Sequence, residues 1–329
     1  MSEYHTPVLL QESIEALVQN PNGIYADATF GGGGHTAAIL SRLSGDGKVI
    51  AFDRDIDAIN NAISDERLTL VHNNFRFIEN YAEGLRRSLA DARDDNGKAR
   101  DDNGKARDDR GPAVFDGILA DLGVSSHQFD TADRGFSFRF EDAPLDMRMN
   151  QEAKLTAKEV VNSYTEEDLE KILRLYGEVD GARNMARLIA QARNAKEINT
   201  TGELDAAIAK MLPKGAEHKV LAKVYQALRI EVNQEMRSLE KFLDGAARSL
   251  KPGGRLVVIT YHSLEDRMVK NFIKTGNVEG TVNQDIFGKA DTPLEAVNRK
   301  PILPEESEIQ QNTRARSAKL RIAERRAGE

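Results

Sequence analysis

The stretch "DATFGGGGHT" (residues 27–36) places four consecutive glycines between an apolar segment and a histidine that can open a helix. Glycine loses more conformational freedom on folding than any other residue, so four in a row indicate that the backbone must approach something closely. The segment "GIYADATF" (23–30) has the composition of a buried strand, and "HTAAILSRLS" (35–44) has apolar residues at helical spacing. The stretch therefore predicts a strand, a glycine loop and a helix, in that order.

The glycine loop is compatible with more than one ligand. No lysine follows the glycines, so a nucleotide-triphosphate P-loop is not favoured. The dinucleotide pattern G-x-G-x-x-G/A fits Gly32, Gly34 and Ala37, and Asp53 closes the next strand where an acid would bind a ribose. This combination predicts an adenosine-type cofactor at the carboxyl ends of a parallel sheet. The alternative is a tight turn that packs against the sheet and binds nothing.

Further apolar segments continue the pattern. Strands are expected at 48–53, 68–72, 116–121, 250–261 and 317–323. Helical segments separate the first four strands, and such connections are right-handed crossovers between parallel strands. The sequence therefore predicts an α/β protein with a doubly wound, mostly parallel, Rossmann-like sheet.

Two segments interrupt the alternation. "ARDDNGK" at 92–98 is repeated at once at 99–105, and we interpret 92–109 as a solvated, charged loop without assigned function. The second segment, 139–225, is helical and is predicted to form an inserted all-helical domain between the two parts of the core, 1–138 and 226–329. It contains two capping-box signals, Thr156 with Glu159 and Thr200 with Glu203.

Composition limits the class of protein. The 329 residues are 40% apolar and 30% charged, with a net charge of −7 and no cysteine. Disulfides, thiolate metal sites and cysteine nucleophiles are excluded, and no metal site is predicted. We find no signal peptide and no apolar run of the roughly 18 residues that a membrane helix needs, so we expect a cytoplasmic protein without membrane contacts.

Charge separates the candidate cofactors. A dinucleotide carries a pyrophosphate, whereas S-adenosylmethionine carries a sulfonium cation and an amino-acid group. Asp27, Asp53 and Asp121 lie in or at the ends of three predicted strands, and in a doubly wound sheet these ends converge on one crevice. Because carboxylates favour a cation, we prefer S-adenosylmethionine, with the glycines admitting its methionine part.

Several motifs together resemble one family, the bacterial 16S rRNA cytosine-N4 methyltransferases. They are "HTPVLLQE" (5–12), "DATFGGGGHT" (27–36), "FDRD" (52–55), "DGILADLGVSSHQFD" (116–130), "RGFSF" (134–138), "PLDMRM" (144–149), "YQALRIEVN" (225–233), "LKPGGRL" (250–256), "HSLEDR" (262–267) and "RARSAKLR" (314–321). The resemblance implies a class I methyltransferase core with a helical insertion. It also implies methylation of N4 of cytosine 1402 in the 16S rRNA of the small ribosomal subunit.

The resemblance also implies which residues form the site. The implied cofactor contacts are Gly33, Gly34, His35, Asp53, Phe75, Asp121 and Gln128. Taken alone, Phe75 also fits a core aromatic and His35 a first-turn helix residue. The chain lacks the Asp/Asn-Pro-Pro-aromatic tetrad that other amino-methyltransferases use to accept the amine proton. The acceptor therefore stays open between a backbone carbonyl near 122–123 and the side chains of Ser125, Ser126 and Asp146.

Substrate binding is expected near the fifth strand and in a basic tail. His262 follows that strand and is a candidate to hold the flipped cytosine, while Ser263 and Asp266 are spaced as a helix N-cap pair. The stretch 314–326 is the most basic of the chain, and either binds phosphate or is simply solvated. The arginines that would extend this patch are Arg134, Arg139, Arg148 and Arg229.

Two other functions are compatible with part of these features. A non-catalytic RNA-binding or ribosome-assembly factor would keep the fold and the basic residues without methyl transfer. An NAD-linked dehydrogenase would use the glycine loop for a dinucleotide, although we find no convincing acid–base pair for hydride transfer. The sequence leaves open whether the chain forms a homodimer.

Overall fold

The computed structural model describes residues 7–94, 113–282 and 292–327. The chain divides into two compact units, one formed by Met1–Gly123 with Arg237–Glu329 and the other by Val124–Met236. The predicted repeat loop at 92–109 is wrong for residues 92–94, which are helical, and the rest of that segment lies outside the described residues. Among the described residues no helix is long and apolar enough to cross a membrane.

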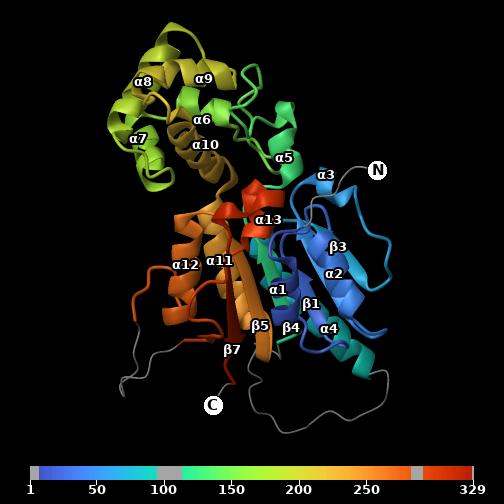
Figure 1. Cartoon of the computed structure of the whole chain (residues 1–329). Coiled ribbons are helices and arrows are strands. Elements are labelled where there is room, and N and C mark those ends of the chain that lie inside the picture. The colour runs from blue at the N-terminus through green and yellow to red at the C-terminus, as the bar shows by residue number, and fades with distance from the viewer. Residues whose placement is uncertain (1–6, 95–112, 283–291, 328–329) are drawn as a thin grey trace, which may run out of the picture. The chain divides into compact units, whose positions relative to one another are not determined.

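The first unit is built on a seven-stranded sheet with the strand order β3-β2-β1-β4-β5-β7-β6 (Figure 1). The strands are β1 (Ile24–Asp27), β2 (Lys48–Asp53), β3 (Leu68–His72), β4 (Phe115–Asp121), β5 (Leu250–Thr260), β6 (Leu294–Ala296) and β7 (Lys319–Arg325). The pairs from β3 to β5 are all parallel, whereas β7 pairs antiparallel with both β5 and β6. The predicted doubly wound, mostly parallel sheet is confirmed.

Helices in this unit connect and cover the strands. They are α1 (Leu10–Leu17), α2 (Gly34–Arg42), α3 (Ile56–Ile59), α4 (Ile78–Asp94), most of α11 (Glu235–Ser249), α12 (Ser263–Thr275) and α13 (Glu306–Gln311), with the 3-10 turns η1 (Phe75–Phe77) and η4 (Thr313–Ser317). The strand expected at 317–323 starts two residues later, because η4 continues through Ser317.

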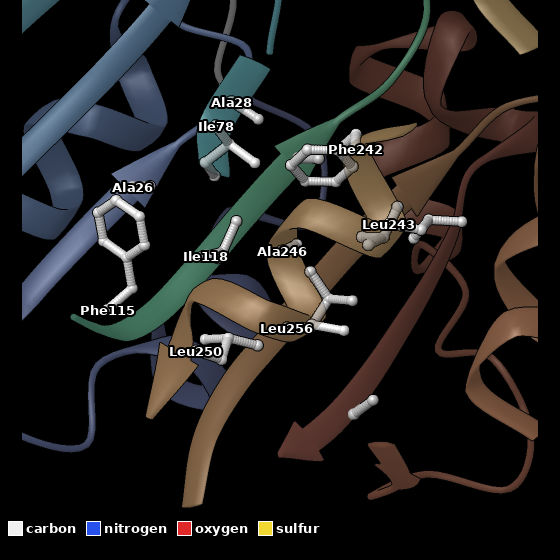
Figure 2. Close-up of a cluster of buried hydrophobic side chains, with 14 of the residues drawn as sticks. Ala26, Ala28, Ile78, Phe115, Ile118, Phe242, Leu243, Ala246, Leu250 and Leu256 are labelled. Atoms are coloured by element: carbon white, nitrogen blue, oxygen red, sulfur yellow. The ribbon is translucent and has the colours of Figure 1, made fainter. Parts of the chain in front are cut away.

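The sheet is buried on both faces, as a parallel sheet between helices must be. Along β4, Ile118 belongs to one apolar cluster and Leu119 to the other, because successive side chains of a strand point to opposite faces. Figure 2 shows the first cluster, in which Phe242 and Ala246 of α11 pack near Ile118. The two clusters hold the strands in place and so position the residues at their ends.

The second unit is helical and has its own core. Its helices are α5 (Ser126–Asp130), α6 (Ala157–Ser163), α7 (Glu166–Leu175), α8 (Ala182–Ala195), α9 (Thr201–Ile208) and α10 (Glu217–Asn233), with the 3-10 turns η2 (Ala132–Arg134) and η3 (Ala209–Met211). Both predicted capping boxes are present, at Thr156 with Glu159 and at Thr200 with Glu203.

The boundaries of this unit differ from the predicted 139–225. It begins at Val124 and ends at Met236. The reason is its core, which includes Phe136 before the predicted start, and Leu228 and Val232 after the predicted end. Helical periodicity marks where helices run, whereas the extent of a core depends on which residues pack together.

Candidate functional site

The glycine loop has two physical reasons for its composition. Gly31 and Gly33 have φ angles of 50° and 77°, a left-handed conformation that favours glycine. A Cβ on Gly33 would lie 2.9 Å from Phe30 Cζ, and one on Gly34 would lie 2.3 Å from Pro7 Cγ. Packing therefore accounts for part of the run, while Gly32 is exposed and does not have a left-handed φ.

Asp53, the last residue of β2, fixes this loop. Its Oδ2 accepts a hydrogen bond of 2.8 Å from the backbone N–H of Gly31, and its Oδ1 accepts one of 2.8 Å from that of Asp55. Burial raises the pKa of the Asp53 carboxyl, while these two hydrogen bonds act in the opposite direction. Each carboxylate oxygen keeps a second lone pair for a ligand.

The other two strand-end carboxylates flank His35, in the first turn of α2. Asp121 Oδ2 lies 3.7 Å from His35 Nδ1. Asp27 is fully buried, and its Oδ2 accepts a hydrogen bond of 2.6 Å from Thr36 Oγ1. Burial raises the pKa of both carboxyls, that of Asp121 to about 6, and His35 opposes both shifts. β1 lies between β2 and β4, so the predicted convergence of acids at one edge is confirmed for the first unit.

His35 has an unused polar atom. Its side chain is buried, and its Nε2 has no hydrogen-bond partner among the residues that the structure describes. Buried ring nitrogens are normally satisfied, so an orphaned one next to two carboxylates is a feature that a polar ligand would explain.

Phe75 lies just after β3, in η1. Its ring meets that of Phe242 edge-to-face, with centroids 5.1 Å apart and an interplanar angle of 76°. It packs against the core cluster yet is only partly buried. Part of the Phe75 ring is therefore a core contact, as one of the two interpretations of this residue predicted. A contact between the remaining surface of the ring and a purine stays a prediction.

Two residues of this site were not predicted. The hydroxyl of Tyr261 donates a hydrogen bond of 2.7 Å to Asp121 Oδ1. The hydroxyl oxygen of Thr29 accepts a hydrogen bond of 2.7 Å from the backbone N–H of Asp121. Thr29 stands inside the motif "DATFGGGGHT" (27–36), and Tyr261 directly follows β5, but only the tertiary structure brings them to Asp121.

His262 caps α12, which corrects one prediction. Its Nδ1 accepts from the backbone N–H of Glu265 at 3.5 Å, and its Nε2 lies 3.1 Å from Glu265 Oε1. The predicted N-cap pair of Ser263 and Asp266 is wrong, because Ser263 is already the first helical residue. Asp266 instead pairs with Arg321 of β7, whose Nε is 2.7 Å from Asp266 Oδ1.

The remaining predicted site residues belong to the helical unit. Ser125 and Gln128 form the capping box of α5: Ser125 Oγ accepts from the backbone N–H of Gln128, and Gln128 Oε1 accepts from that of Ser125, both at 3.2 Å. Ser126 is the first residue of that helix. Asp146 forms a close ion pair with Arg148, with 2.6 Å between Asp146 Oδ2 and an Arg148 terminal nitrogen.

The arginines that were predicted to extend a phosphate-binding patch have partners within the chain. These contacts are Arg134 with the carbonyls of Arg148 and Met149, Arg139 with Asp130, Arg148 with Asp146, and Arg229 with Glu235. In the basic tail, Arg321 is buried and paired with Asp266. These contacts reduce the charge that either region offers to phosphate.

The geometry of the first unit fits a cationic adenosine compound better than a dinucleotide. Asp27 and Asp121 flank His35 beside the glycine loop, where a pyrophosphate would meet like charges. The sheet is parallel from β3 to β5, has an antiparallel β7 between β5 and β6, and carries acids at the ends of β1, β2 and β4. The fold is that of a class I methyltransferase.

Comparison with known proteins agrees with this class. The model of the MraW methylase family matches residues 2–326, and the chain belongs to this family. Proteins named "Ribosomal RNA small subunit methyltransferase H" from Bacteroides fragilis strain YCH46 and Bacteroides thetaiotaomicron are 52% and 51% identical, each over 98% of both chains. The protein of that name from Flavobacterium johnsoniae is 49% identical, also over 98% of both chains. The protein is therefore a methyltransferase with S-adenosylmethionine as methyl donor, and the dehydrogenase alternative is not supported.

We expect the affinity for S-adenosylmethionine to fall as the pH drops through about 6, because Asp121, whose pKa is raised to about 6, then loses its negative charge. Calorimetric titration between about pH 5 and pH 8 measures this. Asp121→Asn should weaken binding at the upper end and flatten the profile, which separates Asp121 from Asp27 and Asp53. A flat profile in the unsubstituted protein would contradict this role for Asp121.

The same raised pKa has the opposite effect on the ligand-free protein. The pKa of the Asp121 carboxyl in the folded state lies above the roughly 3.9 of an aspartate in an unfolded chain. Asp121 therefore increases the free energy of unfolding at low pH. That contribution is lost as the pH rises through about 6. Binding and ligand-free stability should therefore move in opposite directions across this window.

Proposed function

We propose that this protein methylates the exocyclic N4 of cytosine 1402 in the 16S rRNA of the small ribosomal subunit. The main support is that relatives named ribosomal RNA small subunit methyltransferases are 52% identical over 98% of both chains, so core and insertion are shared alike. The choice of N4 and of position 1402 rests on the motifs that resemble the cytosine-N4 methyltransferases.

The proposed cofactor contacts are those implied by the resemblance. Bound S-adenosylmethionine supplies a methyl group on a sulfonium, which is already a good leaving group. Asp53 would accept the two ribose hydroxyls with the lone pairs left free by its backbone contacts. Asp121 and the orphaned Nε2 of His35 would face the amino-acid part, and Gly33 and Gly34 would let the backbone come close. Phe75 and Gln128 complete the proposed set.

The protein must orient the amine and accept its proton. The N4 lone pair is delocalised into the ring, so the amine must be oriented before it attacks the methyl group. Holding the amine in this orientation is the main contribution that the residues can make to the rate. Ser125 Oγ accepts one backbone N–H and keeps a second lone pair for an N4 hydrogen. Asp146 is held in one orientation by Arg148, and Ser126 and the carbonyls near 122–123 stay candidates as well.

The decisive experiment is methyl transfer from radiolabelled S-adenosylmethionine to undermethylated small subunits, followed by mapping of the labelled nucleoside. We expect N4-methylcytidine at position 1402. Label at another atom or nucleotide would contradict the proposal. Binding of S-adenosylmethionine and of the subunit without any transfer would favour the non-catalytic assembly factor.

His262 can be tested without disturbing its helix. Asparagine is among the best N-cap residues, so His262→Asn should keep the cap of α12 and change the free energy of unfolding by less than about 1 kcal/mol. If the imidazole holds the cytosine, kcat/KM for subunits should fall at least about tenfold, with S-adenosylmethionine affinity unchanged. Unchanged kinetics in a stable variant would leave His262 with only its structural role.

A further inference from the structure

The polar face of α8 differs from the other charged surfaces of the helical unit. The helix contains three arginines and no acidic residue, in a chain with a net charge of −7. Its buried side consists of Ala182, Met185, Ala186 and Ile189. The exposed side, which we call the α8 face, consists of Arg183, Asn184, Arg187, Gln191 and Asn194.

The two arginines of the α8 face are available to a partner. Arg183 and Arg187 are exposed, and neither has an ion pair or side-chain hydrogen bond within the described ranges. The third arginine, Arg193, donates a hydrogen bond of 2.8 Å to the carbonyl of Val161. Asp180, just before the helix, lies 3.8 Å from Lys223 Nζ. Within the described part of the chain, Arg183 and Arg187 therefore stand unpaired on the α8 face, whereas the four arginines of the predicted phosphate-binding patch have partners within the chain.

A neighbouring turn adds more positive charge. The methyl carbon of Met211, in η3, would lie 2.9 Å from a Cβ on Gly181, which is the N-cap of α8. Lys210 and Lys214, on either side of this contact in the sequence, are exposed. α8 and α9 also pack together, as Figure 1 shows, so η3 follows directly from a neighbouring helix. The basic surface thus extends beyond the start of α8.

We propose that the α8 face binds the phosphate backbone of the rRNA substrate through Arg183 and Arg187. This inference rests on one part of the proposed function, namely that the substrate is an rRNA. Consecutive arginines four residues apart lie on one side of a helix, about 6 Å apart along its axis. A guanidinium binds phosphate in a bidentate manner, and the amides of Asn184 and Gln191 can donate to or accept from sugar and base edges.

The position of Arg183 supports a partner that is negatively charged. It lies in the first turn of α8, where no acidic residue is present. A cation at this end of a helix is unfavourable, because the helix dipole is positive there. A bound phosphate would remove this repulsion. Replacement by alanine should therefore not destabilise the folded protein.

The test is the salt dependence of RNA binding by the full chain with Arg183→Ala and Arg187→Ala combined. The probe is a fluorescently labelled transcript of the 16S rRNA segment around cytosine 1402, and binding is followed by anisotropy at several salt concentrations. We expect roughly tenfold weaker binding at about 0.1 M salt, and a log K against log[salt] slope that is smaller by about 1.4.

The matched control is Lys171→Ala with Arg174→Ala on α7. These residues are exposed and carry the same charge, but acidic residues, Glu167 and Glu170, stand one turn earlier. An unchanged slope in the α8 variant, or an equal loss in the control, would overturn the inference. So would lost affinity for intact subunits with full affinity for the transcript, which would indicate a protein partner.

This outcome can be separated from that of the proposed function. Binding to the transcript does not require transfer, so a protein that methylates a different nucleotide of this RNA would still show the smaller slope. Calorimetry with S-adenosylmethionine should give the same affinity in both double variants and the unsubstituted chain. An altered affinity in the α8 variant alone would contradict a role confined to RNA.

Discussion

Asp53→Ala should lower the affinity for S-adenosylmethionine at least about a hundredfold and reduce methyl transfer to background. Each hydrogen bond to a charged group contributes about 1.5–3 kcal/mol, and the variant loses those to both proposed ribose hydroxyls. It also removes the acceptor of the Gly31 N–H, which is 2.8 Å from Asp53 Oδ2 and helps to hold the loop. Calorimetry measures binding, and labelled small subunits measure transfer.

The control for this prediction is Asp46→Ala. Asp46 is an exposed acid in the turn before β2, so its replacement changes the net charge equally without touching the loop. Binding should be unchanged in the control. Near-normal affinity in Asp53→Ala would exclude Asp53 as a ribose ligand. If methyl transfer were slow despite that affinity, the role of Asp53 would lie in the chemical step.

Gly33→Ala should damage both the fold of the loop and cofactor binding. The φ angle of 77° costs an alanine about 1–2 kcal/mol, and its Cβ would lie 2.9 Å from Phe30 Cζ and 3.0 Å from Ile63 Cδ1. We expect the free energy of unfolding to fall by about 2 kcal/mol or more and S-adenosylmethionine binding to weaken more than tenfold. Thermal unfolding and calorimetry provide the two measurements.

Gly32→Ala is the matched comparison. Gly32 is exposed and does not have a left-handed φ, so an alanine should be accepted with little change in stability. Equal losses in the two variants would mean that the whole run requires glycine for the ligand rather than for packing. If neither substitution changed stability or binding, the strain expected from a Cβ at Gly33 would be contradicted.

Much of the core could be predicted because its signals are local. The first five strands are apolar runs bounded by turn residues, and acids at the ends of β1, β2 and β4 share one edge of a parallel sheet. The three residues of β6 are too few to show a period. The tyrosine contact with Asp121 joins residues 140 positions apart, so no local pattern could indicate it.

The cap of α12 shows a second limit of sequence reasoning. The letters "HSLED" (262–266) contain two overlapping cap patterns, one from His262 to Glu265 and one from Ser263 to Asp266. The first forms, because Glu265 Oε2 also accepts from the backbone N–H of Tyr261 at 2.9 Å. Asp266 is occupied by Arg321, a partner from a distant strand. A local hydrogen bond therefore supports the first pattern, and a tertiary contact with β7 takes Asp266 away from the second.

The place of the helical unit in the chain has a consequence for biosynthesis. The ribosome makes β4 before Val124–Met236 and β5 after it. The edge of β4 that pairs with β5 therefore has no partner strand while the whole helical unit is synthesised. That edge is apolar and unpaired in the meantime, which makes a nascent chain stopped before residue 250 prone to aggregation. The core of the helical unit consists of residues made before β5, so we expect this unit to fold first, to shorten the loop that separates β4 from β5 and so to speed completion of the sheet.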